Sequence, residues 1–112
     1  MEPQSKGEER ELRAGRNQAL FRAVNEQLEA LHDGSARQTI ACECADVACT
    51  QIIEIDHEQY TTVRRNPRRF VVLPGHVYPE VESVVEERDG YVVVEKHRVA
   101  AKFVEAVDAA RS

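Results

Sequence analysis

The 112-residue sequence contains no tryptophan, one methionine, and only three phenylalanines and three tyrosines. With so few aromatic residues, the core of the protein must consist mainly of valine, isoleucine, leucine and alanine. No apolar run approaches the roughly 18 residues that a membrane-spanning helix requires. The polar, acidic N-terminus also lacks the pattern of a signal peptide. The sequence therefore predicts a cytoplasmic protein with no membrane segment.

The sequence also lacks a basic excess, because 20 acidic residues outnumber 15 basic ones and the net charge is −5. Proteins that bind nucleic acids usually carry the opposite balance. A local exception is the cluster of Arg64, Arg65, Arg68 and Arg69. Guanidinium groups suit phosphate recognition, but we favour a structural role at the end of a helix and in a turn. The acidic segment 80–89 is one candidate partner for these arginines on the surface.

Common catalytic motifs are missing as well. The chain has no glycine-rich phosphate loop, no G-x-S-x-G and no H-E-x-x-H. An enzymatic interpretation is therefore left without a named nucleophile or general base, and a non-enzymatic protein is the better hypothesis.

Apolar spacing and turn residues predict an α+β protein, with a disordered tail at 1–9 and a single domain at 10–112. The expected order is helix, strand, strand, helix, strand, helix, strand, helix. The approximate ranges are 11–32, 38–41, 50–55, 57–65, 70–73, 79–89, 91–95 and 99–110. We expect one small mixed sheet of three or four strands with the helices, including a long N-terminal one, packed against it. The strands at 51–55 and 70–73 would form a parallel pair with a right-handed crossover.

The N-terminal helix carries a short heptad-like stripe at steps of four, three, four and three residues. Its members are Asn17, Phe21, Val24, Leu28 and Leu31. A stripe of this kind usually packs on the protein's own core, which is the interpretation we prefer. The alternative is that it binds a protein partner or a second copy of the chain.

All three cysteines, Cys42, Cys44 and Cys49, fall within eight residues in a C-x-C-x4-C pattern. An odd number of cysteines in a cytosolic chain suits a ligand cluster better than a disulfide framework. Structural zinc takes four ligands in a tetrahedron and accepts thiolates and imidazoles. His76 is the best candidate for the fourth ligand, because it follows a proline-glycine turn that can aim its side chain at a neighbouring loop.

Several alternatives to this zinc site stay open. The fourth ligand could be His57 or Asp46, the metal could be an iron–sulfur cluster, or the cysteines could simply be small buried residues. A nucleophilic cysteine paired with His76 is a further option. A complete Cys3His set would leave no position for a substrate or water, so such a site would be structural.

Four segments of the chain share a pattern: NQALFRAVNE (17–26), CEC through the cysteine at 49, RFVV with PGH (69–76), and YVVVEK (91–96). Together they resemble a group of small, uncharacterised actinobacterial proteins over about 80 of 112 residues. In that group the cysteines and the Pro-Gly-His turn belong together, so the resemblance implies the same ligand set. Ala45 departs from the pattern, where glycine is expected. The resemblance implies no activity.

The leading hypothesis from the sequence is a non-enzymatic, zinc-stabilised interaction or regulatory protein. The alternatives are a thiol- or metal-dependent redox sensor or enzyme that uses the same cysteines, and a metal-free domain. An exposed apolar stripe on the N-terminal helix would favour the first hypothesis. A low thiol pKa or a pocket beside Cys44 would favour the second.

Overall fold

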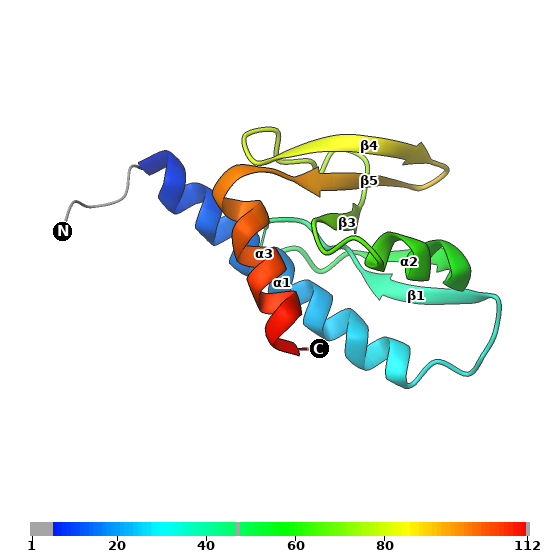
Figure 1. Cartoon of the computed structure of the whole chain (residues 1–112). Coiled ribbons are helices and arrows are strands. Elements are labelled where there is room, and N and C mark those ends of the chain that lie inside the picture. Colours follow the sequence, from blue (N-terminus) through cyan, green and yellow to red (C-terminus); the bar gives the residue numbers. More distant parts are fainter. Residues whose placement is uncertain (1–5, 47, 112) are drawn as a thin grey trace.

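A computed structural model describes residues 6–46 and 48–111 of the chain. In chain order the elements are α1 (Lys6–Ala30), β1 (Arg37–Ala41), β2 (Ile52–Asp56), α2 (His57–Arg64), β3 (Arg69–Val72), β4 (Glu82–Arg88), β5 (Tyr91–Lys96) and α3 (Arg98–Arg111). This arrangement confirms the α+β class and the long N-terminal helix (Figure 1). Helix α1 begins at Lys6, earlier than expected from the sequence, and the first five residues of the expected tail lie outside the described residues.

The strands form two antiparallel sheets and not one mixed sheet. One contains β1 and β2, and the other has the order β3-β5-β4. The expected parallel pair is therefore wrong, because β2 and β3 belong to different sheets and every strand pair within the described residues is antiparallel. Strand β2 turns back onto β1 after the cysteine-containing loop, while β5 lies between β4 and β3. The helix α2 thus connects two sheets and is not a crossover within one.

The segment expected to be a helix at 79–89 is instead strand β4. Its turn is the two-residue pair Asp89-Gly90, since Arg88 pairs with Tyr91 and Gly90 has φ of +87°. An Asp-Gly pair between two apolar runs is typical of a β-hairpin. The helix-like spacing of the valines in this segment arises from a register shift between Val84 and Glu86, because a bulge breaks the alternation that identifies a strand.

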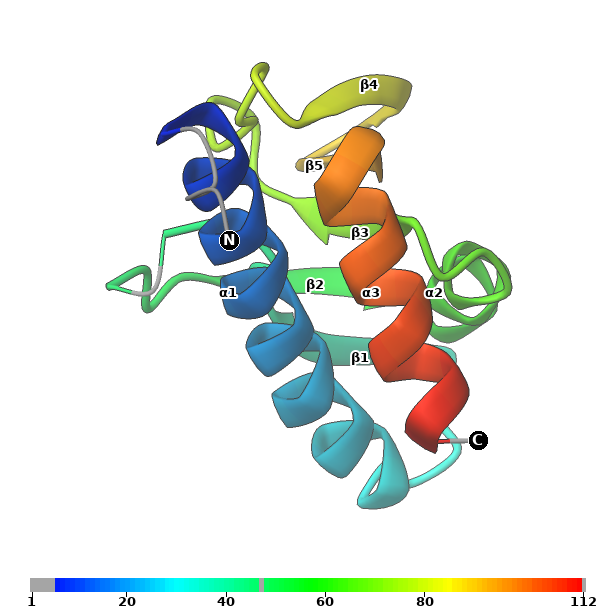
Figure 2. The same cartoon turned by 60° about the vertical axis from the view of Figure 1, so that its left-hand side comes forward.

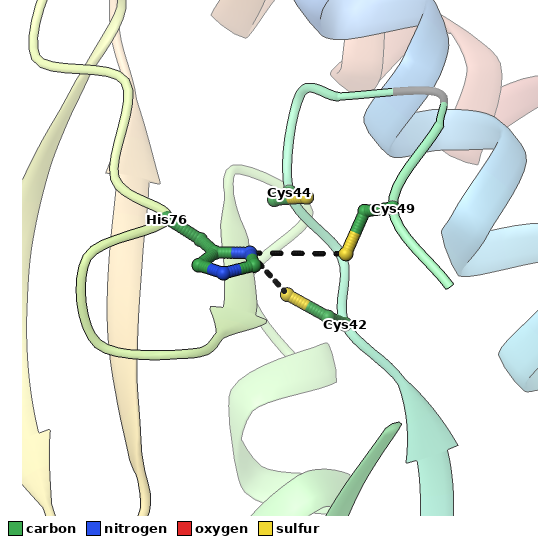
Figure 3. Close-up of side chains that lie close together, drawn as sticks. All are labelled: Cys42, Cys44, Cys49 and His76. Atoms are coloured by element: carbon green, nitrogen blue, oxygen red, sulfur yellow. Dashed lines mark hydrogen bonds between the residues drawn. The ribbon is translucent and has the colours of Figure 1, made fainter. Parts of the chain in front are cut away.

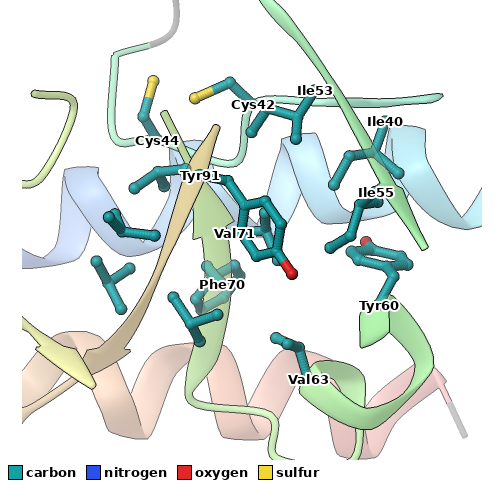
Figure 4. Close-up of a cluster of buried hydrophobic side chains, with 14 of the residues drawn as sticks. Ile40, Cys42, Cys44, Ile53, Ile55, Tyr60, Val63, Phe70, Val71 and Tyr91 are labelled. Carbon is teal, nitrogen blue, oxygen red and sulfur yellow. The ribbon is translucent and has the colours of Figure 1, made fainter. Parts of the chain in front are cut away.

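The hydrophobic core lies between the two sheets and α2 (Figure 4). Tyr60 and Val63 of α2 contribute to it, and Phe70 and Val71 of β3 lie at its centre with at most 1% of their surface exposed. The core members are Ile40, Cys42, Cys44, Ile53, Ile55, Tyr60, Val63, Phe70, Val71, Val72, Tyr91, Val92, Val93, Val94 and Val104. Two of the three cysteines therefore stand at the edge of the core.

Helices α1 and α3 run side by side in front of the strands (Figure 2). The face of α1 that points inward is mostly polar and consists of Ala14, Gln18, Arg22 and Asn25, all buried. Their steps of four, four and three residues are those of one helix face. We expected the apolar stripe to pack on the protein's own sheet. That expectation is wrong for Val24, Leu28 and Leu31, which are exposed.

Three large apolar residues of α1, together with Leu31 just after its end, are exposed. Leu20, Val24, Leu28 and Leu31 are 52%, 43%, 41% and 82% exposed. The C-terminal half of α1 thus buries polar side chains and exposes several apolar ones, the reverse of an ordinary surface helix. Within the described residues, no helix combines the length and the hydropathy needed to cross a membrane.

Candidate metal centre

The cysteines lie in the loop that connects β1 to β2. Cys42 continues the pairing of the two strands, because its backbone N–H donates to the carbonyl of Gln51 at 3.0 Å. The return of the loop begins at Asp46, whose carbonyl accepts from the N–H of Cys49 at 3.0 Å and whose side chain accepts from the N–H of Ala48 at 2.9 Å. The loop therefore brings Cys49 back beside the strand end that carries Cys42.

His76 reaches the same place from the other sheet. After β3 the chain turns at Gly75, which has φ of +85°, and the N–H of His76 donates to the carbonyl of Leu73 at 3.0 Å. A positive φ of this size favours glycine. The turn points the imidazole of His76 toward the cysteine sulfurs (Figure 3).

Four ligand atoms converge in this way. The sulfurs of Cys42, Cys44 and Cys49 and a ring nitrogen of His76 all lie within 4.8 Å of one another. The Nδ1 atom of His76 is 3.7 Å from the sulfur of Cys42 and 3.7 Å from that of Cys49. In a tetrahedral zinc site, bond lengths of about 2.3 Å to sulfur and 2.0 Å to nitrogen place a sulfur and a nitrogen ligand about 3.6 Å apart. The group could therefore hold one metal ion.

The sulfur atoms are held in a mostly apolar, partly enclosed environment. Burial raises the pKa of Cys42 to about 12 and also raises the pKa of Cys44, because a thiolate is poorly solvated there. The N–H of Leu73 opposes this effect by donating to the sulfur of Cys42 at 3.3 Å. A divalent cation would favour the thiolates and displace their protons.

The glutamate between two of the cysteines points in the opposite direction, into the protein. Glu43 is completely buried and accepts hydrogen bonds from the Arg22 guanidinium at 3.2 Å, Asn25 at 3.0 Å, the Tyr60 hydroxyl at 2.6 Å and the N–H of Val71 at 3.0 Å. The cysteine segment is therefore tied to α1, α2 and β3 at once.

A second buried carboxylate, Glu82 at the start of β4, contacts α1 nearer its N-terminus. Glu82 accepts from Gln18 at 2.9 Å, forms an ion pair with Lys96 at 2.6 Å and accepts from the N–H of Tyr78 at 2.9 Å. Glu82 and Lys96 are 2% and 1% exposed. Sequence reasoning missed both buried carboxylates. The only available signal was that α1 carries its polar residues at helical spacing.

A cavity of about 480 Å³ adjoins the cluster. Cys44 and His76 form part of its wall, and Arg13 and Asn17 of α1 and Tyr78 form other parts. The candidate metal site therefore has an opening on the side of Cys44.

The alternative fourth ligands are placed differently. His57 stacks on His32 with the ring centroids 4.5 Å apart and hydrogen-bonds to Gln38, so its ring is engaged elsewhere. Asp46 lies in the cysteine loop but is exposed, and its carboxylate accepts the N–H of Ala48. Among the described residues, neither belongs to the group of converging ligand atoms.

The arginine cluster is largely engaged with acidic side chains. Arg64 pairs with Glu26 and Glu29 of α1, and Arg68 pairs with Glu105 of α3 at 2.6 Å. Arg69 pairs with Glu95 at 3.1 Å. These ion pairs join the cluster to α1, α3 and β5.

The chain matches no family model, no curated protein and no solved structure in three separate comparisons. The resemblance to small actinobacterial proteins therefore stays a prediction.

Proposed function

We propose that the protein is a non-enzymatic interaction protein whose fold is stabilised by one zinc ion bound to Cys42, Cys44, Cys49 and His76. The observation that carries this proposal is the separation of the ligand atoms, which are all within 4.8 Å of one another. Burial of small cysteines would account for Cys42 and Cys44, but it does not account for a histidine from the other sheet whose Nδ1 lies 3.7 Å from two sulfurs.

Zinc is favoured over an iron–sulfur cluster by the size of the group. Zinc is commonly bound by three thiolates and one imidazole. An iron–sulfur cluster with two or more irons binds its protein ligands through different iron atoms. The distance between ligand atoms on different irons is therefore longer than the distance between two ligand atoms on one zinc ion. Four ligand atoms within 4.8 Å suit one ion.

A structural role for the zinc follows from its complete ligand set, since catalytic zinc keeps a position for water or substrate. The ion would also join the two sheets, because three ligands come from the β1–β2 loop and the fourth follows β3. Such a link contributes directly to the stability of a small domain.

The redox or enzymatic alternative has one observation in its favour, namely the cavity beside Cys44. Against it, burial raises the pKa of Cys42 and Cys44, whereas reactive cysteines usually have a lowered pKa. The exposed stripe of leucines and valine on α1 supports the interaction hypothesis.

The test is the metal content of protein purified without a metal-chelating tag. Elemental mass spectrometry should find about one zinc per chain in the wild type, as a single tetrahedral site requires, and much less in Cys44→Ser and His76→Ala. His57→Ala is the matched control, because His57 lies outside the cluster, and it should keep its zinc. A wild type without metal, or equal zinc in His76→Ala and His57→Ala, would contradict the proposal. If the wild type contains stoichiometric iron and no zinc, the bound metal is iron and the zinc assignment is wrong.

A further inference from the structure

Among the described residues, the exposed large hydrophobic side chains gather mainly on the outer face of α1 and the turn that follows it. Four positions on this face follow one another at steps of four, three and four residues: Leu20, Val24, Gln27 and Leu31. This is the spacing of a helix-pairing seam. Leu28 lies beside this seam. Hydrogen bonds from the N–H groups of residues 31 and 32 to the carbonyls of residues 28 and 29 extend the seam one step past the end of α1.

Within residues 6–46 and 48–111, no other segment buries this seam, since Leu20, Val24 and Leu31 are each more than 40% exposed. Figure 2 shows α1 and α3 in front with the strands behind them. The buried side chains of Arg22 and Asn25 donate hydrogen bonds to the carbonyls of Arg69 in β3 and Ala41 in β1. The outward direction is therefore set by the inner contacts of Arg22 and Asn25 with Glu43. Rotating the helix to bury the leucines would break the contacts of a buried carboxylate, which is costly.

We propose that this seam binds a second copy of the chain, with the two α1 helices antiparallel about a two-fold axis that passes between Val24 and Gln27. This arrangement puts Leu20 opposite Leu31 of the second copy. Interfaces of this kind use the same patch on both subunits. The inference rests on the proposed function and names the partner.

Charge complementarity supports a second copy in this orientation. Arg16 is exposed near the N-terminal end of the seam, where its guanidinium also lies 5.9 Å from the centre of the Phe103 ring of α3. Asp33 is exposed just beyond the C-terminal end, and its carboxylate also accepts the N–H of Ser35. The proposed axis places Arg16 opposite residue 35 of the second copy, two residues from Asp33 in the turn that follows α1. A parallel pair would instead bring arginine next to arginine and aspartate next to aspartate. Between the two charges, the outward positions 20, 24, 27, 28 and 31 carry no acidic or basic residue.

The first test is sedimentation equilibrium of the full chain, zinc-loaded, from micromolar to submillimolar concentration. The wild type should form a dimer of twice the 12.7 kDa chain mass. Val24→Glu should weaken the dimer by a factor of roughly 30 or more, as expected for a central interface residue. Val84→Glu is the matched control, because Val84 is 42% exposed and Val24 is 43% exposed. A monomeric wild type, or equal dimerisation of Val24→Glu and wild type, would overturn the proposal.

The second test is a charge exchange, which tests the antiparallel arrangement of the two α1 helices. At low ionic strength, Arg16→Glu and Asp33→Arg should each weaken the dimer several-fold. The double variant should return to near the wild-type dissociation constant. Single variants that weaken the dimer and a double variant that weakens it further would overturn the antiparallel arrangement.

Zinc content measured on the same samples distinguishes the two proposals. A zinc-bound monomer would overturn the self-pairing and leave the metal site standing. A dimer without metal would leave the self-pairing standing and contradict the zinc proposal.

Discussion

Replacing Glu43 by glutamine tests whether the buried carboxylate holds the cysteine segment on α1. The substitution preserves the shape of the side chain but removes its charge. The new amide N–H group must then face a site built from donors, namely Arg22, Asn25, Tyr60 and the N–H of Val71. Arg22, only 4% exposed, would lose its ionic partner.

The expected loss of stability for Glu43→Gln is about 2–3 kcal/mol, the upper range for hydrogen bonds to a charged group. Glu43→Ala should cost about 3–5 kcal/mol, as when one partner of a buried ion pair is removed. Arg22 keeps a hydrogen bond to the carbonyl of Arg69 and its position over the Phe70 ring, which limits the damage. For a domain with a total stability of about 5–15 kcal/mol, the glutamine variant should remain folded.

The assay is urea unfolding followed by circular dichroism, since the chain has no tryptophan. It should be done with a chelator present, so that metal binding does not contribute. Glu54→Gln is the matched control, because Glu54 lies on β2 with its side chain exposed, and it should change stability by less than about 0.5 kcal/mol. If the two glutamine variants unfold at the same urea concentration, the reasoning about the buried network is wrong.

Three further predictions follow from single residues. Gly75→Ala and Gly34→Ala should each cost about 1–2 kcal/mol, because both glycines have positive φ with no atom nearby to clash. Only Gly75→Ala should weaken zinc binding in a chelator competition, because Gly75 lies in the turn that positions His76. Equal weakening in both variants would contradict this role of the turn. Burial raises the pKa of Tyr60, so the unfolded phenol releases its proton first and stability should fall as pH rises through about 10. As pH rises through about 10, the urea midpoint of Tyr60→Phe should decrease less steeply than that of the wild type. Equal slopes in the two proteins would refute this. Arg68→Ala should cost no more than about 1 kcal/mol, because its ion pair is nearly half exposed; a loss above about 2 kcal/mol in the urea assay would contradict it.

Most of the elements could be predicted from local patterns, and the one wrong element has a clear cause. Valines at 81, 84 and 85 resemble a helix face, but the bulge at Val85 produces that spacing within a strand. A glycine such as Gly90 can also end a helix, but here Asp89-Gly90 is the hairpin turn between β4 and β5. The pairing of strands was wrong for a different reason. Sheet order depends on which apolar faces meet, and short apolar strands carry little information about their partners.

The ligand set could be proposed because its residue types are uncommon and its spacing is local. Three cysteines within eight residues and a Pro-Gly-His turn are visible without a structure, although only the structure brings His76 to the sulfurs. The buried carboxylates could not be identified in this way. Glu43 lies between two cysteines and Glu82 lies beside Val81. Nothing local marks either glutamate as buried, because their burial depends on partners up to 64 residues away.

The orientation of α1 follows from those carboxylates. An amphipathic helix normally buries its leucines, because removing apolar surface from water is favourable. On α1 that gain competes with the need of Glu43 and Glu82 for donors inside the protein, and Gln18, Arg22 and Asn25 provide them. An unpaired buried charge costs more than a few half-exposed leucines. The same residues that anchor the cysteine segment therefore turn the apolar face outward, so the candidate metal centre and the candidate pairing surface have a common physical origin.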